Sequence, residues 1–184
     1  MTNEVARYAF IGCGKSKKDG VHPARELYDS NYAHLKRDYA ERYCEGYSIL
    51  SAKHGPVAPT EWIESYNTTL RDAGDSEMET YRDRVYEMLS WNERNDVWLG
   101  YDQVVVLAGS AYIEPIRPLL DELEACIPEL TVHYPFEDTN GIGEQMAWLR
   151  AKIDEYDGEP DIPEPSTRSK QAGLTAFADG GGER

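Results

Sequence analysis

The sequence predicts an α/β fold: a single domain with a mostly parallel sheet of about four or five strands flanked by helices, in a Rossmann-like arrangement. Short apolar runs alternate along the chain with longer segments in which apolar residues recur every three or four positions. The run at residues 102–108 is continuously apolar and β-branched, which is typical of a strand buried on both faces of a parallel sheet. A chain of 184 residues fits one domain that needs no disulfides or metal for its core.

The first half of the chain contains two expected strands. Residues 8–13 predict a buried strand that ends at a glycine and a lysine-rich loop. Residues 23–43 carry aromatic and apolar side chains at helical spacing, so we expect one helix there. Residues 47–52 predict the second strand. Pro56 and Pro59 then predict a loop that continues to about residue 70, because each proline removes a backbone donor and constrains the residue before it.

The second half continues the alternation. Residues 76–91 predict a helix with Ser76 as its N-cap. After the strand at 102–108 we expect a helix to about residue 126, a short strand at 130–134 and a last helix at 142–156. The folded domain should therefore comprise residues 1–156. Residues 157–184, which are acidic and rich in proline and glycine, predict a disordered tail.

The charge distribution is uneven. Asp and Glu number 34 against 19 Lys and Arg, for a net charge of -15, which argues against a generic binder of polyanions. The first 44 residues nevertheless carry eight basic and six acidic residues, so positive charge gathers near the N-terminus. The abundance of acidic residues together with only seven lysines favours a halophilic host. An ordinary acidic cytosolic protein is the alternative.

The cysteine and histidine spacings exclude several classes of protein. The three cysteines form no CxxC pair, and an odd count without a signal peptide indicates a reduced, cytoplasmic protein. The four histidines lack the paired spacing of metal ligands, so neither a metal nor a cofactor is expected. No apolar run approaches the roughly 20 residues of a membrane span. A membrane protein is therefore excluded.

Three of the expected strands end in polar, glycine-containing segments, at residues 12–18, 51–55 and 108–112. Because the carboxyl ends of parallel strands share one edge of the sheet, these segments should converge on one crevice. The residues expected to bind a ligand there are Gly12, Gly14, Lys15, Ser16, Lys17, Ser51, Gly109, Ser110 and Tyr112.

The first of these loops suggests a site for an anion, but not for ATP hydrolysis. Its glycines and lysines suit a phosphate, a carboxylate or a nucleic-acid backbone, although a solvated basic turn would have the same composition. The loop lacks the GxxxxGK[ST] spacing of a P-loop. Aromatic residues such as Trp62, Tyr66 and Trp148 either pack in the core or stack on a base.

Three residues of the expected crevice are candidates for catalysis. Cys13 is the candidate nucleophile, because neighbouring lysines favour a thiolate, although a small buried residue is the alternative. His54 is the candidate general acid or base, and Lys53 would bind phosphate or polarise a carbonyl.

Four segments together resemble a widespread uncharacterised microbial and viral domain family with ICxxxK, PAxxLY and ILSAKxGLxxP motifs. They read IGCGKSK at 11–17, PARELY at 23–28, ILSAKHGPVAP at 49–59 and IESYNTTL at 63–70. The resemblance covers most of residues 8–150 and implies an α/β fold with a shared pocket. Pro56 stands where a leucine is usual and Ser65 where a proline is usual, so the loop shape should differ.

The segment at 49–70 is also similar to the ILSGLYGLLRPLDLIQPY stretch of the peroxide-stress YaaA proteins. The likeness rests on this stretch and on the small-residue-plus-lysine turn after the first strand. It implies an association with DNA binding and with protection from oxidative damage.

The leading hypothesis from the sequence is a small α/β enzyme or enzyme-like domain that acts on a nucleotide, nucleobase or modified nucleic acid. The alternative is a noncatalytic, DNA-binding stress-protection protein similar to YaaA, and a third reading is an interaction module without a ligand. The sequence leaves open whether the chain is catalytic, what its oligomeric state is and which proteins it meets.

The charge makes one expectation directly testable. A net charge of -15 on a small domain repels itself when screening is removed, because the Debye length grows to about 30 Å at 0.01 M salt. We therefore predict that the melting temperature followed by circular dichroism falls as KCl is lowered from molar to millimolar. An unchanged melting temperature would remove the inference of a halophilic host.

Overall fold

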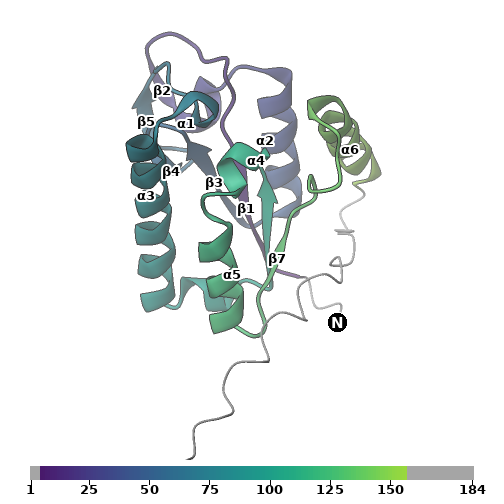
Figure 1. Ribbon diagram of the computed structural model, residues 1–184. Coiled ribbons are helices and arrows are strands. Elements are labelled where there is room, and N and C mark those ends of the chain that lie inside the picture. Colours follow the sequence, from purple (N-terminus) through teal and green to yellow (C-terminus); the bar gives the residue numbers. More distant parts are fainter. Residues whose placement is uncertain (1–4, 157–184) are drawn as a thin grey trace, which may run out of the picture.

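The computed structural model describes residues 5–156 and is built around one five-stranded sheet (Figure 1). The strand order is β4-β3-β1-β6-β7, and every neighbouring pair is parallel except β3 with β4. The expected single α/β domain with a mostly parallel sheet is confirmed. The tail expected at residues 157–184 lies outside the described residues. The strands of the sheet are β1 (Arg7–Gly12), β3 (Gly46–Ser51), β4 (Gly55–Val57), β6 (Gln103–Leu107) and β7 (Thr131–His133).

Helices cover both faces of the sheet, as the buried β-branched strand β6 requires. The helices α2 (Asn31–Tyr43) and α6 (Ile142–Glu155) lie on one face, and α3 (Asp75–Arg94) and α5 (Arg117–Cys126) on the other (Figure 1). Side chains of β1 alternate between the two layers. Ala9 packs in the core beneath α2, whereas Phe10 packs in the core beneath α3 and α5.

The helix expected at 23–43 is in fact two helices. A short α1 (Ala24–Leu27) precedes α2, and the chain is extended at Tyr28 between them. Ser30 causes the restart, because its hydroxyl accepts a hydrogen bond from the Ala33 N–H at 3.1 Å and so caps α2. The break turns the chain at the carboxyl edge of the sheet and leaves Tyr28 buried there.

The proline-rich loop expected at 56–70 contains regular structure as well. Besides β4 it includes β5 (Trp62–Glu64), which pairs antiparallel with β2 (Val21–Pro23), and a 3₁₀ turn, η1 (Leu70–Asp72). Pro56 is tolerated in β4 because that strand is at the edge of the sheet. These elements form the rim above the carboxyl ends of the strands (Figure 1).

Two further helices differ at their ends from the expectation. Helix α3 has Gly74 rather than Ser76 at its N-cap, and the Gly74 N–H donates to the Glu77 carboxylate at 2.9 Å. The helix expected from about residue 113 to 126 begins instead at Arg117, as α5, with Pro118 in its first turn, and a separate short helix, α4 (Ser110–Ile113), precedes it.

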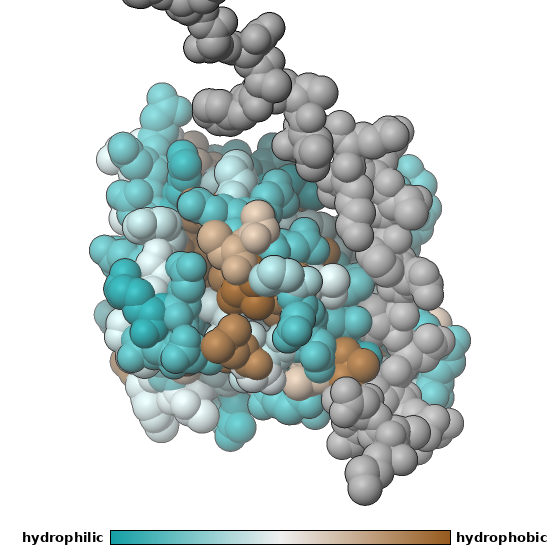
Figure 2. Space-filling view, turned by 90° about the horizontal axis from the view of Figure 1, so that it is seen from below, coloured by the Kyte–Doolittle hydropathy of each residue, from teal (hydrophilic) through white to brown (hydrophobic). Residues whose placement is uncertain are grey.

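Large side chains close the core at the end of α3. The turn η2 (Val97–Gly100) buries Trp98, whose indole N–H donates to the Leu89 carbonyl at 3.2 Å. The uncovered part of the end opposite the strand-end loops is mostly hydrophilic, with small apolar groups scattered near its centre (Figure 2). Within residues 5–156, every helix is too short or too polar to cross a membrane.

Candidate functional site

The strand order places a topological switch point between the ends of β1 and β6. The chain leaves β1 toward the face of α2 and leaves β6 toward the face of α5, so the two loops diverge at the carboxyl edge of the sheet (Figure 1). Open α/β sheets bind their ligands at such a switch point. The strand ends themselves approach closely, since a Cβ at Gly12 would lie 3.0 Å from the Ala108 Cβ. Any larger residue immediately before Cys13 would therefore crowd Ala108.

Cys13 bridges the two loops. Its Sγ lies 3.0 Å from the hydroxyl of Tyr112, a residue of α4, within hydrogen-bonding distance. The backbone carbonyl of Tyr112 in turn accepts a hydrogen bond of 3.1 Å from the Tyr81 hydroxyl on α3. Through Tyr112, the Cys13 thiol is thus linked to α3, which covers the face of the sheet opposite α2.

A second chain of hydroxyl groups crosses the same edge. Tyr66 shares hydrogen bonds of 2.7 Å with both the Tyr28 hydroxyl and the Ser51 hydroxyl at the end of β3. The Ser51 Oγ also accepts from the backbone N–H groups of Lys53 at 3.3 Å and His54 at 3.0 Å. This network ties the end of β3 to the loop after β5.

Two lysines approach the ring of Tyr66. The Lys17 Nζ lies 4.3 Å from the ring centroid and the Lys53 Nζ lies 5.8 Å from it, which are cation–π distances. Burial lowers the pKa of Lys17, and the charge of Cys13 partly offsets that effect. Neither lysine forms a salt bridge within residues 5–156.

A third lysine, Lys36, is buried beneath Cys13. It lies on α2, is 2 % exposed, and donates a hydrogen bond to the Gly12 carbonyl. Its Nζ is 4.2 Å from the centroid of the Tyr32 ring, and no carboxylate of residues 5–156 pairs with it. Burial lowers the pKa of Lys36 to about 8, and the charge of Cys13 opposes the shift.

The surrounding phenols stay neutral. Burial raises the pKa of all four tyrosines around Cys13, and a negative charge on Cys13 raises it further. They therefore act as hydroxyl donors and acceptors rather than as anions at neutral pH. These residues are Tyr28, Tyr66, Tyr81 and Tyr112.

His54 lies beside this network, at the turn into β4. Its ring meets Tyr66 edge-on at 5.4 Å between centroids, and its buried Nε2 has no hydrogen-bond partner within residues 5–156. Burial, then the charges of Lys53 and Arg84, lower the pKa of His54. The imidazole is thus neutral at pH 7. The turn requires Gly55, which has a φ of 71° and whose added Cβ would lie 2.6 Å from the Arg84 Cβ.

The other residues expected to bind a ligand lie further out. Gly14 packs against the start of α2, where a Cβ would lie 3.2 Å from the Ser30 Oγ. Four more are exposed to solvent on the same edge of the sheet: Lys15, Ser16, Gly109 and Ser110. The hydrogen bonds and ring contacts therefore connect three strand ends through Cys13, Lys17, Ser51, Lys53, His54 and Tyr112.

Sequence reasoning missed Lys36, Tyr28 and Tyr81 and assigned Tyr66 no definite role. For Lys36 a signal was available. It occupies the same helical stripe as Tyr32, Tyr39 and Tyr43, where a lysine interrupts an otherwise aromatic face. Charged residues are rarely buried without a partner, so a lysine on the buried stripe of a helix predicts a structural or functional role for its ammonium group.

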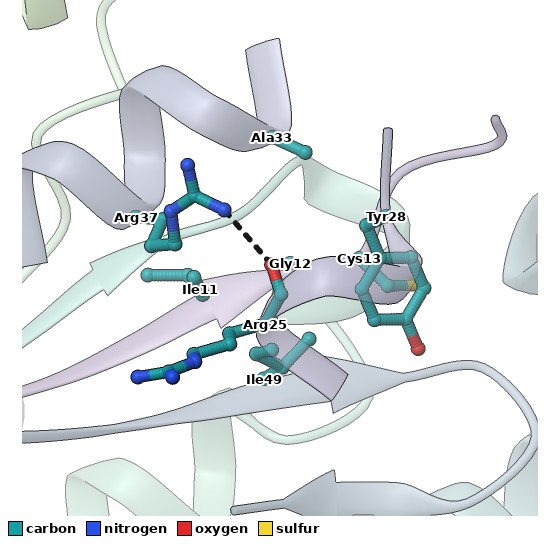
Figure 3. Close-up of a pocket in the computed structure, with 8 residues that line it drawn as sticks. All are labelled: Ile11, Gly12, Cys13, Arg25, Tyr28, Ala33, Arg37 and Ile49. Atoms are coloured by element: carbon teal, nitrogen blue, oxygen red, sulfur yellow. Dashed lines mark hydrogen bonds between the residues drawn. The ribbon is translucent and has the colours of Figure 1, made fainter. Parts of the chain in front are cut away.

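A small cavity of about 10 Å³ lies on the α2 side of Cys13, with space for about one water molecule (Figure 3). Cys13 and Tyr28 lie on one side of it, and Arg25 and Arg37 on the other (Figure 3). The Arg37 guanidinium donates to the Arg25 carbonyl at 3.0 Å and joins α2 to α1. Among the described residues, no three His, Cys, Asp or Glu side chains come together as metal ligands.

Comparison with known proteins identifies the family. The sequence matches the family of unknown function DUF6884 over residues 8–151. The chain belongs to the DUF6884 family. This match confirms the expected membership of an uncharacterised domain family, while the likeness to YaaA proteins stays a prediction.

One curated protein is similar to this DUF6884 member along nearly its whole length. The uncharacterized protein YfjM of Bacillus subtilis (strain 168) is 24% identical over 157 residues, which cover 82% of this chain and 97% of YfjM. No solved structure matches the chain.

The buried Lys36 predicts a specific dependence of stability on pH. Its pKa is about 8 in the folded protein and about 10.5 in the unfolded chain, so between these values the unfolded chain binds more protons. The free energy of unfolding should rise with pH in this window by up to about 1.4 kcal/mol per pH unit. We expect urea melts from pH 7 to 10 to show this rise in the wild type and its loss in Lys36→Met. The exposed Lys18 supplies the control, Lys18→Met, which should follow the wild type. Parallel profiles for all three proteins would contradict the assignment.

Proposed function

We propose that this chain is a small α/β enzyme that acts on a nucleotide, a nucleobase or a modified nucleic acid in the crevice between β1 and β6. The observation that carries the proposal is the gathering of three ammonium groups around Cys13 and Tyr66 without a carboxylate partner within residues 5–156. An anionic ligand would offset the mutual repulsion of these charges and the cost of burying Lys36, the most buried of the three. The three groups belong to Lys17, Lys36 and Lys53.

The chemistry of the crevice suits the two parts of a nucleotide. Lys17 and Lys53 are placed to bind phosphate, which lysine recognises as a point charge. The neutral phenols offer aromatic faces for stacking and hydroxyl groups for the edge of a base.

The proposal assigns two further roles. Cys13 is the nucleophile or the residue that contacts the base, because it lies at the switch point where the loops of β1 and β6 diverge. His54 is the general acid or base, since a neutral imidazole with an unpartnered Nε2 can accept a proton.

A thermal-shift screen in molar salt tests the proposal. Nucleotides, nucleosides, free bases and short DNA are screened separately, and a ligand at about 100 times its Kd should raise the melting temperature by roughly 5 to 10 °C. Lys17→Met and Lys53→Met should each abolish most of that shift. The matched control Lys18→Met removes an exposed lysine of the same loop and should keep it.

The same screen separates the alternative. Noncatalytic DNA binding through phosphates would appear as stabilisation by DNA alone, strong at low salt and lost in molar salt, with Lys18→Met as harmful as Lys17→Met. That pattern, or the absence of any stabilising compound in the screen, would overturn the proposed pocket.

A further inference from the structure

We propose that Lys36 stabilises the anionic form of the Cys13 thiol and so makes Cys13 the nucleophile of the crevice. The inference deepens the proposed function, since it rests on Cys13 being the reactive group of that site. Lys36 acts through Cys13 and is therefore a positioning residue rather than a residue that touches the ligand.

The geometry fixes the ammonium group on the peptide bond that joins Gly12 to Cys13. The Lys36 Nζ donates to the carbonyl of Gly12, the residue immediately before Cys13, and the face of the Tyr32 ring supports it from the other side at 4.2 Å. The side chain reaches this position from α2, whose N-terminus Ser30 anchors beside Gly14. With 2 % exposure, the ammonium group cannot move into solvent.

The charge of Lys36 is costly unless an anion offsets it. Burying an ammonium group costs several kcal/mol when no opposite charge is nearby, and a methionine would fill similar space without that cost. Among the described residues, Cys13 is the group whose charge acts on Lys36. The pair of an ammonium and a thiolate is electrically neutral, so each charge reduces the cost of burying the other.

Other groups around the thiol are less able to do this. Within residues 5–156, five side chains besides Lys36 have a clearly shifted pKa to which Cys13 contributes, and four of them are neutral phenols. The fifth, Lys17, is only partly buried, so water and salt screen its charge. The five are Lys17, Tyr28, Tyr66, Tyr81 and Tyr112.

The rate of Cys13 alkylation by iodoacetamide tests the inference without any ligand. The thiolate is the reacting form, so the rate reports its population. The measurement uses the full chain with Cys126→Ser, because Cys126 is exposed. Burial raises the pKa of Cys44 to about 12, so that thiol stays protonated and slow to react.

We expect Lys36→Met to slow alkylation of Cys13 by about tenfold at pH 7, and by less at pH 10, where Lys36, with a pKa of about 8, is itself neutral. Lys17→Met should have a smaller effect that disappears in molar salt, whereas the effect of Lys36→Met should persist there. Tyr32→Phe keeps the ring under the ammonium and removes only its hydroxyl, so it should react at nearly the wild-type rate. Lys36→Arg keeps the charge and should restore most of the rate lost in Lys36→Met.

A purely structural role for Lys36 predicts the opposite sign. Losing its bond to Gly12 would then loosen the loop and make Cys13 more accessible, so alkylation would become faster. Faster or unchanged alkylation in a folded Lys36→Met protein would overturn the inference. If that variant does not fold, Lys36→Gln gives the same comparison. In addition, Cys13 in Cys126→Ser protein must react faster at pH 7 than Cys126 does in a separate Cys13→Ser protein. Slow alkylation in Lys36→Met together with a failed nucleotide screen would reject the proposed function alone.

Discussion

The parallel pairing of β1 with both β3 and β6 governs the geometry of this protein, because it fixes where three loops begin. All three strands end at one edge of the sheet, and the chain then leaves β1 and β6 toward opposite faces. A gap between these two loops follows from the topology alone. Gly12 lets the strand ends approach closely, so the gap is narrow and Cys13 can reach Tyr112 across it.

The charges around Cys13 favour the binding of an anion. The phenols around Cys13 are held neutral, and the three lysines have no carboxylate partner within residues 5–156. A site of this kind is incomplete on its own, since its positive charge calls for an anion. In the proposed site a phosphate-bearing ligand would supply that negative charge. The acidic surface of the rest of the chain would keep nonspecific polyanions away and leave this edge as the place where an anion is attracted.

Periodicity in the sequence was sufficient to predict the sheet, its parallel character and the edge where polar loops meet. It did not predict the boundaries of helices and strands where a side chain caps a helix or where a short strand lies at a sheet edge. Ser30 restarted a helix that spacing alone made continuous, and two prolines did not prevent β4 and β5 from forming at the edges of sheets. In the site, topology was sufficient to predict that residues next to the strand ends lie at one edge of the sheet. Topology could not place Tyr66, because it reaches the site from a segment whose packing angle the sequence does not determine. For Lys36 the available signal was its position on an otherwise aromatic stripe of α2.

If Cys13 lies within a ligand-binding crevice, a bound ligand should protect its thiol from alkylation. Cys126→Ser protein would be treated with iodoacetamide in molar salt, alone and with a millimolar mixture of nucleoside monophosphates, with free bases and short DNA as separate arms. We expect nucleotides or bases to slow the alkylation of Cys13. Nucleotides should not raise the melting temperature of a Lys53→Met control, which lacks one of the proposed phosphate ligands. Alkylation of Cys13 at one rate in every arm would contradict this expectation.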